Sequence, residues 1–125
     1  MIALILAALA LAGPQDSRAP ALPPLPVILD HAAAAWPEQP AKARRVAVCE
    51  MGADVESGAY PAVVFDLDRR YAGPMQIGQS WAKHFAGRWT WAEIVTDLDA
   101  HFAAAREIYD LAGGWSPWPY CGRLN

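Results

Sequence analysis

The chain has 125 residues, of which 54% are hydrophobic and 18% charged, so it can build one packed domain but is too short for two. Its net charge is −3, and its arginines cluster only at Arg44–Arg45 and Arg69–Arg70. This balance argues against a nucleic-acid-binding protein, because such surfaces need extended basic patches.

Residues 1–12 form an uninterrupted apolar run that Gly13 and Pro14 close. A bilayer-spanning helix needs about 20 apolar residues, whereas the core of a signal peptide needs about 7 to 15. We therefore expect a secretory signal that is cut after Ala12 and a secreted or periplasmic protein. The run is preceded by no Lys or Arg, so an uncleaved membrane anchor stays as the alternative.

Residues 13–26 carry five prolines among small residues and are expected to form an extended linker. The domain is then expected to span residues 27–125. Apolar spacing predicts helices over residues 27–36 and 40–50, with Pro37 ending the first and Pro40 opening the second.

Glu50 lies at the end of the second predicted helix, on the same stripe as Ala43, Val46 and Ala47. Gly52 suits the left-handed position that ends a helix. Burial on an apolar stripe would raise the pKa of the Glu50 carboxyl and let it act as a general acid. The alternative is an ordinary solvated acid at a helix end.

Cys49 and Cys121 are the two cysteines of the chain. In an exported protein they are expected to form one disulfide, which would hold the C-terminus beside Glu50. Closing so long a loop contributes roughly 4 kcal/mol by the chain-entropy model. Two unrelated buried thiols are the alternative.

Between Gly52 and Gly73 the hydrophobic period changes to two, with Val63, Phe65 and Leu67 alternating with other residues. This pattern predicts a strand in a small β-hairpin or irregular lobe. Asp66 and Asp68 would share one face of it, either opposite Glu50 or simply facing water.

Residues 71–78 form a turn rich in Gly and Pro that presents Gln76 between apolar neighbours. The amide would either contact a sugar or be satisfied by backbone groups. A short helix bearing Trp81 should follow.

The longest predicted helix starts at a capping box, Thr90–Glu93, is broken near Asp97–Asp99 and stops at Gly113–Gly114. Residues 115–121 contain two prolines and are expected to pack as an aromatic strap held by Cys121. The chain has six tryptophans. Some are expected to line a groove and stack on sugars, and at least half to fill the core.

Four segments carry a resemblance to a known family. They are Val46–Glu50, where a Cys-Glu pair ends a helix; Gly73–Ile77, a Gly-x-Met-Gln turn followed by Trp81; Ala103–Tyr109; and Gly114–Trp118, a Gly-Trp-x-Pro-Trp ending before Cys121. Over residues 27–125 they resemble the small lysozyme-like domains of lytic transglycosylases and resuscitation-promoting factors. The chain departs from them at Met51, where Ser is usual, and at His101, where Asn is frequent.

The resemblance implies an α+β, mainly α, lysozyme-like fold with a small β-hairpin lobe. It also implies an enzyme that cleaves peptidoglycan glycan strands, in which Glu50 protonates the oxygen between N-acetylmuramic acid and N-acetylglucosamine. A transglycosylase needs only this acid, whereas a hydrolase would use Asp66 or Asp68 as well. Gln76 would position the substrate, and the cleft would be lined by Tyr71, Trp81 and Tyr109.

Two other classes of function stay open: a catalytically silent peptidoglycan-binding module and a cell-envelope protein that docks partners through its tryptophans. We expect a monomer without metal or cofactor, because His31, His84 and His101 share no ligand motif and no phosphate-binding glycine pattern is present. We expect no nucleic-acid partner, and membrane contact only through an uncleaved signal.

Overall fold

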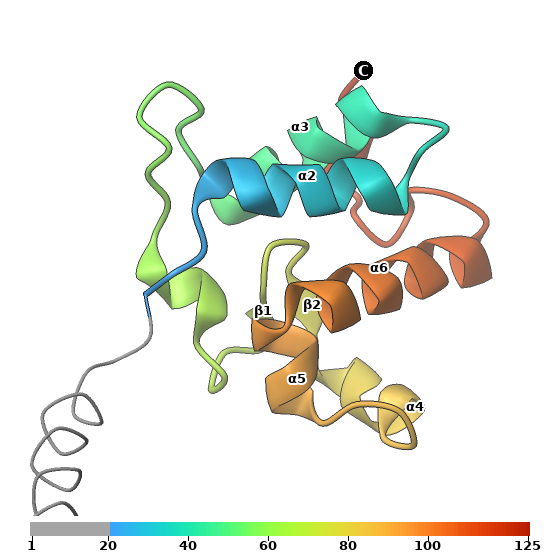
Figure 1. Ribbon diagram of the computed structural model, residues 1–125. Helices are drawn as coiled ribbons and strands as arrows, with labels where there is room; N and C mark the ends of the chain where they lie inside the picture. Colours follow the sequence, from blue (N-terminus) through green and yellow to red (C-terminus); the bar gives the residue numbers. More distant parts are fainter. Residues whose placement is uncertain (1–20) are drawn as a thin grey trace, which may run out of the picture.

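The computed structural model describes residues 21–125 as a mainly helical α+β domain with one two-stranded hairpin (Figure 1), and it contains one disulfide. The expected class is confirmed. The expected signal peptide and residues 13–20 of the expected linker lie outside the described residues. The helices and strands are α2 (Leu25–Ala35), α3 (Pro40–Met51), β1 (Tyr71–Ala72), β2 (Ile77–Gly78), α4 (Ala82–Phe85), α5 (Trp91–Thr96) and α6 (Leu98–Ala112). Within residues 21–125, every helix is too short or too polar to cross a bilayer.

Helices α2 and α3 both start with proline in their first turn, where the missing N–H would have no helical partner anyway. Helix α2 begins at Leu25, two residues before the expected start of the domain. Helix α3 ends at Met51, and Gly52 after it has the left-handed φ of 65° that glycine adopts without strain. The predicted end of the Glu50 helix is therefore confirmed.

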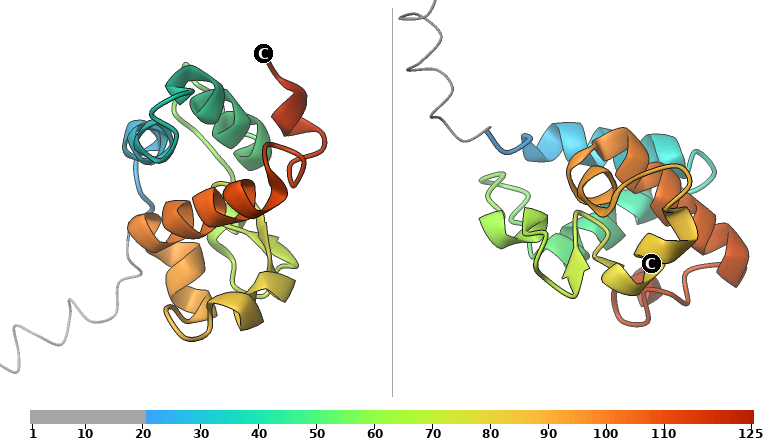
Figure 2. Two further views of the ribbon diagram at one scale, coloured as in Figure 1. Left: turned by 90° about the vertical axis from the view of Figure 1, so that its right-hand side faces the viewer. Right: turned by 90° about the horizontal axis from the view of Figure 1, so that it is seen from below.

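The core lies where α2 packs against both α3 and α6 (Figure 2). Each helix presents a stripe of apolar residues at helical spacing, many of them alanines, which let the helices approach closely. The buried residues of these stripes are Ile28 and Ala32 on α2; Ala43, Val46 and Ala47 on α3; and Phe102, Ala105 and Ile108 on α6.

The expected break in the long helix is confirmed and divides it into α5 and α6. Thr90 and Glu93 form the predicted capping box at the start of α5. The side chain of Asp97 then accepts hydrogen bonds from the backbone N–H groups of Asp99 and Ala100, which starts α6 as a new helix. Helix α6 ends at Gly113, as predicted.

The prediction of a strand around residues 63–67 is wrong, because residues Ala62–Phe65 form a 3-10 helix. Pro61 precedes this helix, and Val64 is its one buried residue. The Asp66 carboxylate then accepts a hydrogen bond from the Asp68 N–H at 2.9 Å, which makes a turn in place of an extended strand. The hairpin occurs later, where Tyr71 pairs with Gly78 and Ala72 with Ile77.

The C-terminal residues 115–121 form the expected strap, and the disulfide between Cys49 and Cys121 is confirmed. Trp115 stacks on buried Trp36 with 5.0 Å between ring centroids, and Trp118 meets the same ring edge-on at 6.2 Å. The strap is thus held by aromatic packing on α2 and by a covalent bond to α3.

Candidate functional site

Glu50 lies one residue before the end of α3, half-buried, and continues the stripe of Ala43, Val46 and Ala47. Burial raises the pKa of its carboxyl from 4.5 to about 6. Its carboxylate forms no ion pair with any residue between 21 and 125, so its charge is not compensated there. A carboxyl with these properties can hold a proton in mildly acidic water.

A groove of about 410 Å³ opens beside Glu50. One wall comes from the hairpin and the other from the strap, and the lining residues are Glu50, Tyr71, Gln76, Pro117, Trp118, Pro119 and Tyr120. Glu50 is the one carboxylate among them. The groove therefore joins a single acid to an amide and to aromatic and proline rings.

A second groove, of about 210 Å³, continues the first along the hairpin. Tyr71, Gln76, Pro117 and Trp118 line both grooves, and the second adds Ser80 and Trp81. Four of the five residues expected at the site, Glu50, Gln76, Tyr71 and Trp81, are thus placed along one continuous depression.

Gln76 has an unusual backbone conformation for the residue at the centre of this depression. Its φ is 49°, and Gln76 is the one non-glycine residue between 21 and 125 with a positive φ. Its side-chain amide donates to the carbonyl oxygen of Gly73 at 2.9 Å, and its backbone N–H donates to the same oxygen at 2.9 Å. The side-chain oxygen Oε1 is left free of hydrogen bonds to described residues and can accept one from a ligand.

The exposed aromatic rim was only partly predictable. Tyr120 is 81% exposed and Tyr71 is 50% exposed, and both line the Glu50 groove. Sequence reasoning named Tyr71 but missed Tyr120, Pro117 and Pro119. A signal was present, because Tyr120 precedes the cysteine that is bonded to the neighbour of Glu50.

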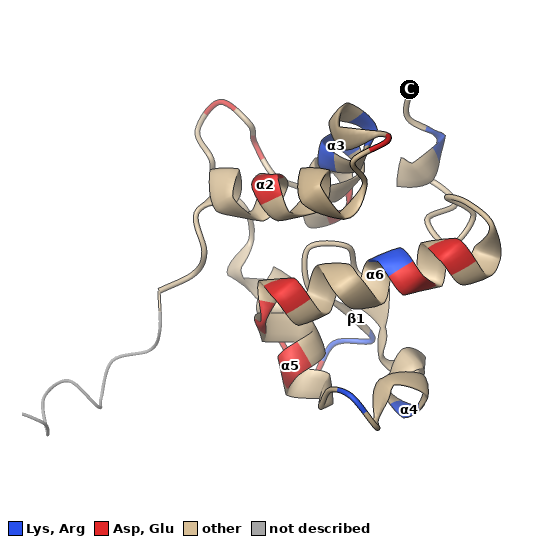
Figure 3. Cartoon of the chain, turned by 45° about the vertical axis from the view of Figure 1, so that its right-hand side comes forward, with Lys and Arg blue, Asp and Glu red and all other residues tan. Residues whose placement is uncertain are grey.

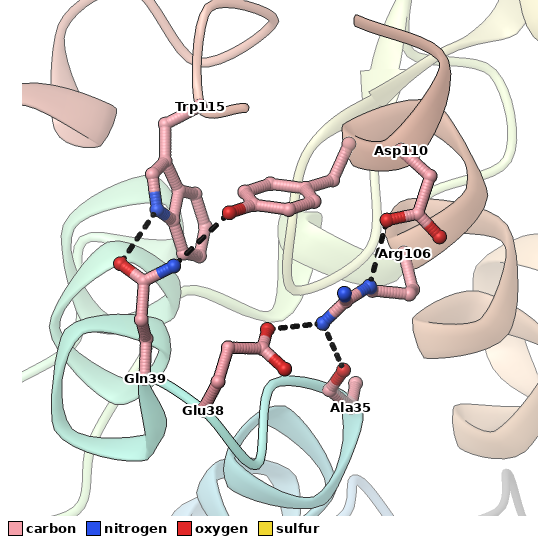
Figure 4. A network of polar contacts seen from close by, with 7 residues as sticks. Ala35, Glu38, Gln39, Arg106, Asp110 and Trp115 are labelled. Atoms are coloured by element: carbon pink, nitrogen blue, oxygen red, sulfur yellow. Dashed lines mark hydrogen bonds and ion pairs between the residues drawn. The ribbon is translucent and has the colours of Figure 1, made fainter. Parts of the chain in front are cut away.

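Tyr109 lies outside both grooves, which corrects its expected place in the cleft. Its hydroxyl accepts a hydrogen bond from Gln39 Nε2 at 3.0 Å, and Gln39 Oε1 accepts one from Trp115 Nε1 at 3.3 Å (Figure 4). In the same network Arg106 bonds to Ala35, Glu38 and Asp110. This network fastens the turn between α2 and α3 to α6 and the strap.

Asp66 and Asp68 are exposed and line neither groove. The three histidines also lie apart. His31 bonds to Asp99, His84 bonds to Glu107, and His101 is buried beneath the hairpin turn. No group of three or more His, Cys, Asp or Glu residues within the described residues is arranged to hold a metal ion.

Residues of both charge signs are mixed along the chain in the cartoon of Figure 3. Lys and Arg are spread over α3, α6, the region near α4 and the C-terminal end, and Asp and Glu are interspersed with them. The groove around Glu50 is accordingly distinguished by its shape, its acid and its aromatic residues.

Comparison with known proteins gives no match to this chain among family models, curated proteins or solved structures.

Proposed function

We propose that this chain is an exported peptidoglycan-cleaving enzyme with a lysozyme-like fold, in which Glu50 is the general acid and base. The observation that carries the proposal is the position of Glu50, half-buried with a pKa of about 6 in the lining of an aromatic groove. An acid that keeps its proton at mildly acidic pH is what cleavage of a glycosidic bond requires.

The placement of the motif segments supports the same proposal. Residues 46–50, 73–77 and 114–118 are separated by 22 and 36 residues in sequence, yet all three contribute residues to the lining of the groove. The fourth segment, residues 103–109, lies on α6, and its Ile108 lines the second groove. These separate short motifs meet around Glu50, which supports the resemblance to the lysozyme-like family.

The single carboxylate favours transglycosylase chemistry. In the first step the Glu50 proton moves to the glycosidic oxygen while the bond from that oxygen to C1 of N-acetylmuramic acid breaks. In the second step the 6-hydroxyl of the same sugar bonds to C1, and its proton returns to the Glu50 carboxylate. The product is a 1,6-anhydro ring, and the Glu50 acid is regenerated. The reaction requires neither a second carboxylate nor a water nucleophile.

The other residues of the groove are suited to holding a glycan strand. The exposed rings of Tyr71 and Tyr120 and the half-buried ring of Trp81 offer apolar faces for sugar rings. The free Oε1 of Gln76 can accept a hydrogen bond from a hydroxyl or an N-acetyl N–H group. These residues give a strand contacts on both sides of Glu50.

The proposal is tested with purified sacculi and three forms of the oxidised domain: wild type, Glu50→Gln and Glu56→Gln. Glu56 is an exposed acid outside both grooves and controls for the loss of one charge. We expect wild type and the Glu56 variant to release soluble fragments, and the Glu50 variant to bind sacculi without releasing any. Saturable binding with no release by wild type would indicate a silent binding module and contradict the enzyme.

A further inference from the structure

The backbone N–H and C=O groups of Met75, which precedes Gln76, are both bonded to buried side chains. Its N–H donates to Nε2 of His101 on α6 at 2.8 Å. Its carbonyl oxygen accepts from Nε1 of Trp118 on the strap at 2.7 Å. The turn that presents Gln76 is therefore clamped between two elements distant in sequence.

His101 can act in this clamp in one protonation form. Its Nδ1 lies 2.9 Å from the carbonyl oxygen of Ile94, which can only accept, so Nδ1 carries the hydrogen. Its Nε2 faces the N–H of Met75, which can only donate, so Nε2 carries none. The side chain has no exposed surface, and each nitrogen is satisfied in this neutral tautomer.

The ring of His101 also fills the space under Gly73. A β-carbon added at Gly73 would lie 2.3 Å from Cε1 and 2.5 Å from Nδ1 of the imidazole. The turn thus rests directly on the ring, and Gly73 itself has a φ of 78°. The turn therefore cannot move closer to α6 at Gly73 without displacing the imidazole.

The conformation of Gln76 requires such support. A non-glycine residue in the left-handed region is strained, and such strain persists only when neighbouring contacts hold it. Gln76 lines both grooves, and its own hydrogen bonds lead back only to Gly73. The bonds to Met75 are the ones that tie this part of the turn to α6 and to the strap.

We propose that His101 is a positioning residue of the site: through the N–H of Met75 it fixes the left-handed conformation of Gln76 and so aims the Gln76 amide at the bound ligand. This inference rests on the proposed function for the identity of the ligand. The geometric part, that His101 determines the conformation of Gln76, is independent of any activity.

The experiment compares His101→Gln with His101→Leu. Gln places Oε1 near the position of Nε2 and can accept from Met75, whereas Leu has similar size and accepts nothing. The first readout is the ¹⁵N–¹H spectrum of the backbone and side-chain amides of Gln76. We expect these resonances to stay at wild-type positions in the Gln variant and to move or broaden in the Leu variant.

The second readout is kcat/KM on sacculi in a double-mutant cycle with Gln76→Ala. We expect His101→Leu to lower kcat/KM about tenfold or more, in line with the cost of a misplaced contact group, and Gln to restore most of it. Because His101 acts through Gln76, the Leu substitution should cost little in the Gln76→Ala background. A merely structural role would give additive losses and would contradict the proposal.

Unchanged Gln76 resonances in a folded Leu variant would overturn the inference, whether or not the protein cleaves peptidoglycan. If the Leu variant does not fold, the Gln variant decides. Retained Gln76 resonances there would support the inference, and their loss in a folded Gln variant would contradict it. Failure of the proposed function would instead appear as absent activity in wild type with the spectral result intact.

Discussion

A disulfide joins Cys49, the residue before Glu50, to Cys121, the residue after Tyr120, with 5.7 Å between their α-carbons. One covalent bond thereby sets the candidate acid and the exposed ring of Tyr120 on neighbouring parts of the same groove. Strap residues 117–120 line the same groove as Glu50, so the disulfide links the stability of the domain to the shape of its candidate site.

Removing the disulfide should therefore weaken the fold strongly. The bond spans 72 residues, for which the chain-entropy model gives about 4 kcal/mol. We expect the Cys49→Ala/Cys121→Ala variant to lose about that much free energy of unfolding in urea titrations against the oxidised wild type. A loss below about 1 kcal/mol would show that the aromatic packing of the strap suffices alone.

The rate of glycan cleavage should follow the protonation of Glu50. The general acid must carry its proton, and its pKa is about 6, so the rate should be high below that pH and fall as pH rises through about 6. Initial rates on sacculi and the ¹³C shift of the Glu50 carboxyl should give the same midpoint.

Tyr120→Ala tests the cause of this shift. Removing the ring should expose the Glu50 carboxyl, lower its pKa towards 4.5 and move the pH–rate curve to lower pH. The Glu56→Gln variant, which leaves the groove intact, should keep the wild-type curve. A midpoint near 4.5 in wild type would contradict burial of Glu50.

Acid should destabilise the domain through His101. Burial lowers the pKa of His101 to about 4, whereas the unfolded chain binds the proton near 6.5. The unfolded state thus holds more protons between these values, and the free energy of unfolding should fall by about 3 kcal/mol as pH drops through this window. His101→Gln should remove this dependence, and His31→Gln should leave it, in unfolding titrations at several pH values.

Gly73 and Gly58 form a matched pair for the contact with His101. Both have a left-handed φ, 78° and 76°, but a β-carbon at Gly58 would meet nothing within 4 Å. Gly58→Ala should cost about 1 to 2 kcal/mol for the backbone alone. Gly73→Ala should cost about 1 to 3 kcal/mol more, because the new carbon overlaps the imidazole. Equal losses in thermal unfolding would contradict the close packing of the turn on His101.

The parts of the fold that depend on local chemistry could be predicted from sequence. Pro40 and Gly52 mark the ends of the Glu50 helix, and the Thr90 capping box and Asp97 mark the starts of α5 and α6. Each signal acts within a few residues, on backbone groups that a helix end leaves unpaired. The location of Glu50 at a helix end follows from the same signals.

Other features depend on contacts between distant segments and could not be predicted. Residues 63–67 alternate like a strand, but no partner strand faces them within residues 21–125, and Pro61 and Asp66 favour turns. The bond from His101 to Met75 spans 26 residues, and nothing in a lone histidine on a helix indicates it. Tyr109 shares an apolar stripe with core residues, and its bond to Gln39 appears only once α6 meets the start of α3.

Mass analysis of the muropeptides that the oxidised domain releases from purified sacculi tests the role of Glu50 most directly. The single-acid mechanism predicts 1,6-anhydromuramyl products from wild type and none from Glu50→Gln, because one carboxyl both gives and recovers the proton. Products with reducing ends would contradict the single-acid mechanism, and release by both proteins would contradict the assignment of Glu50.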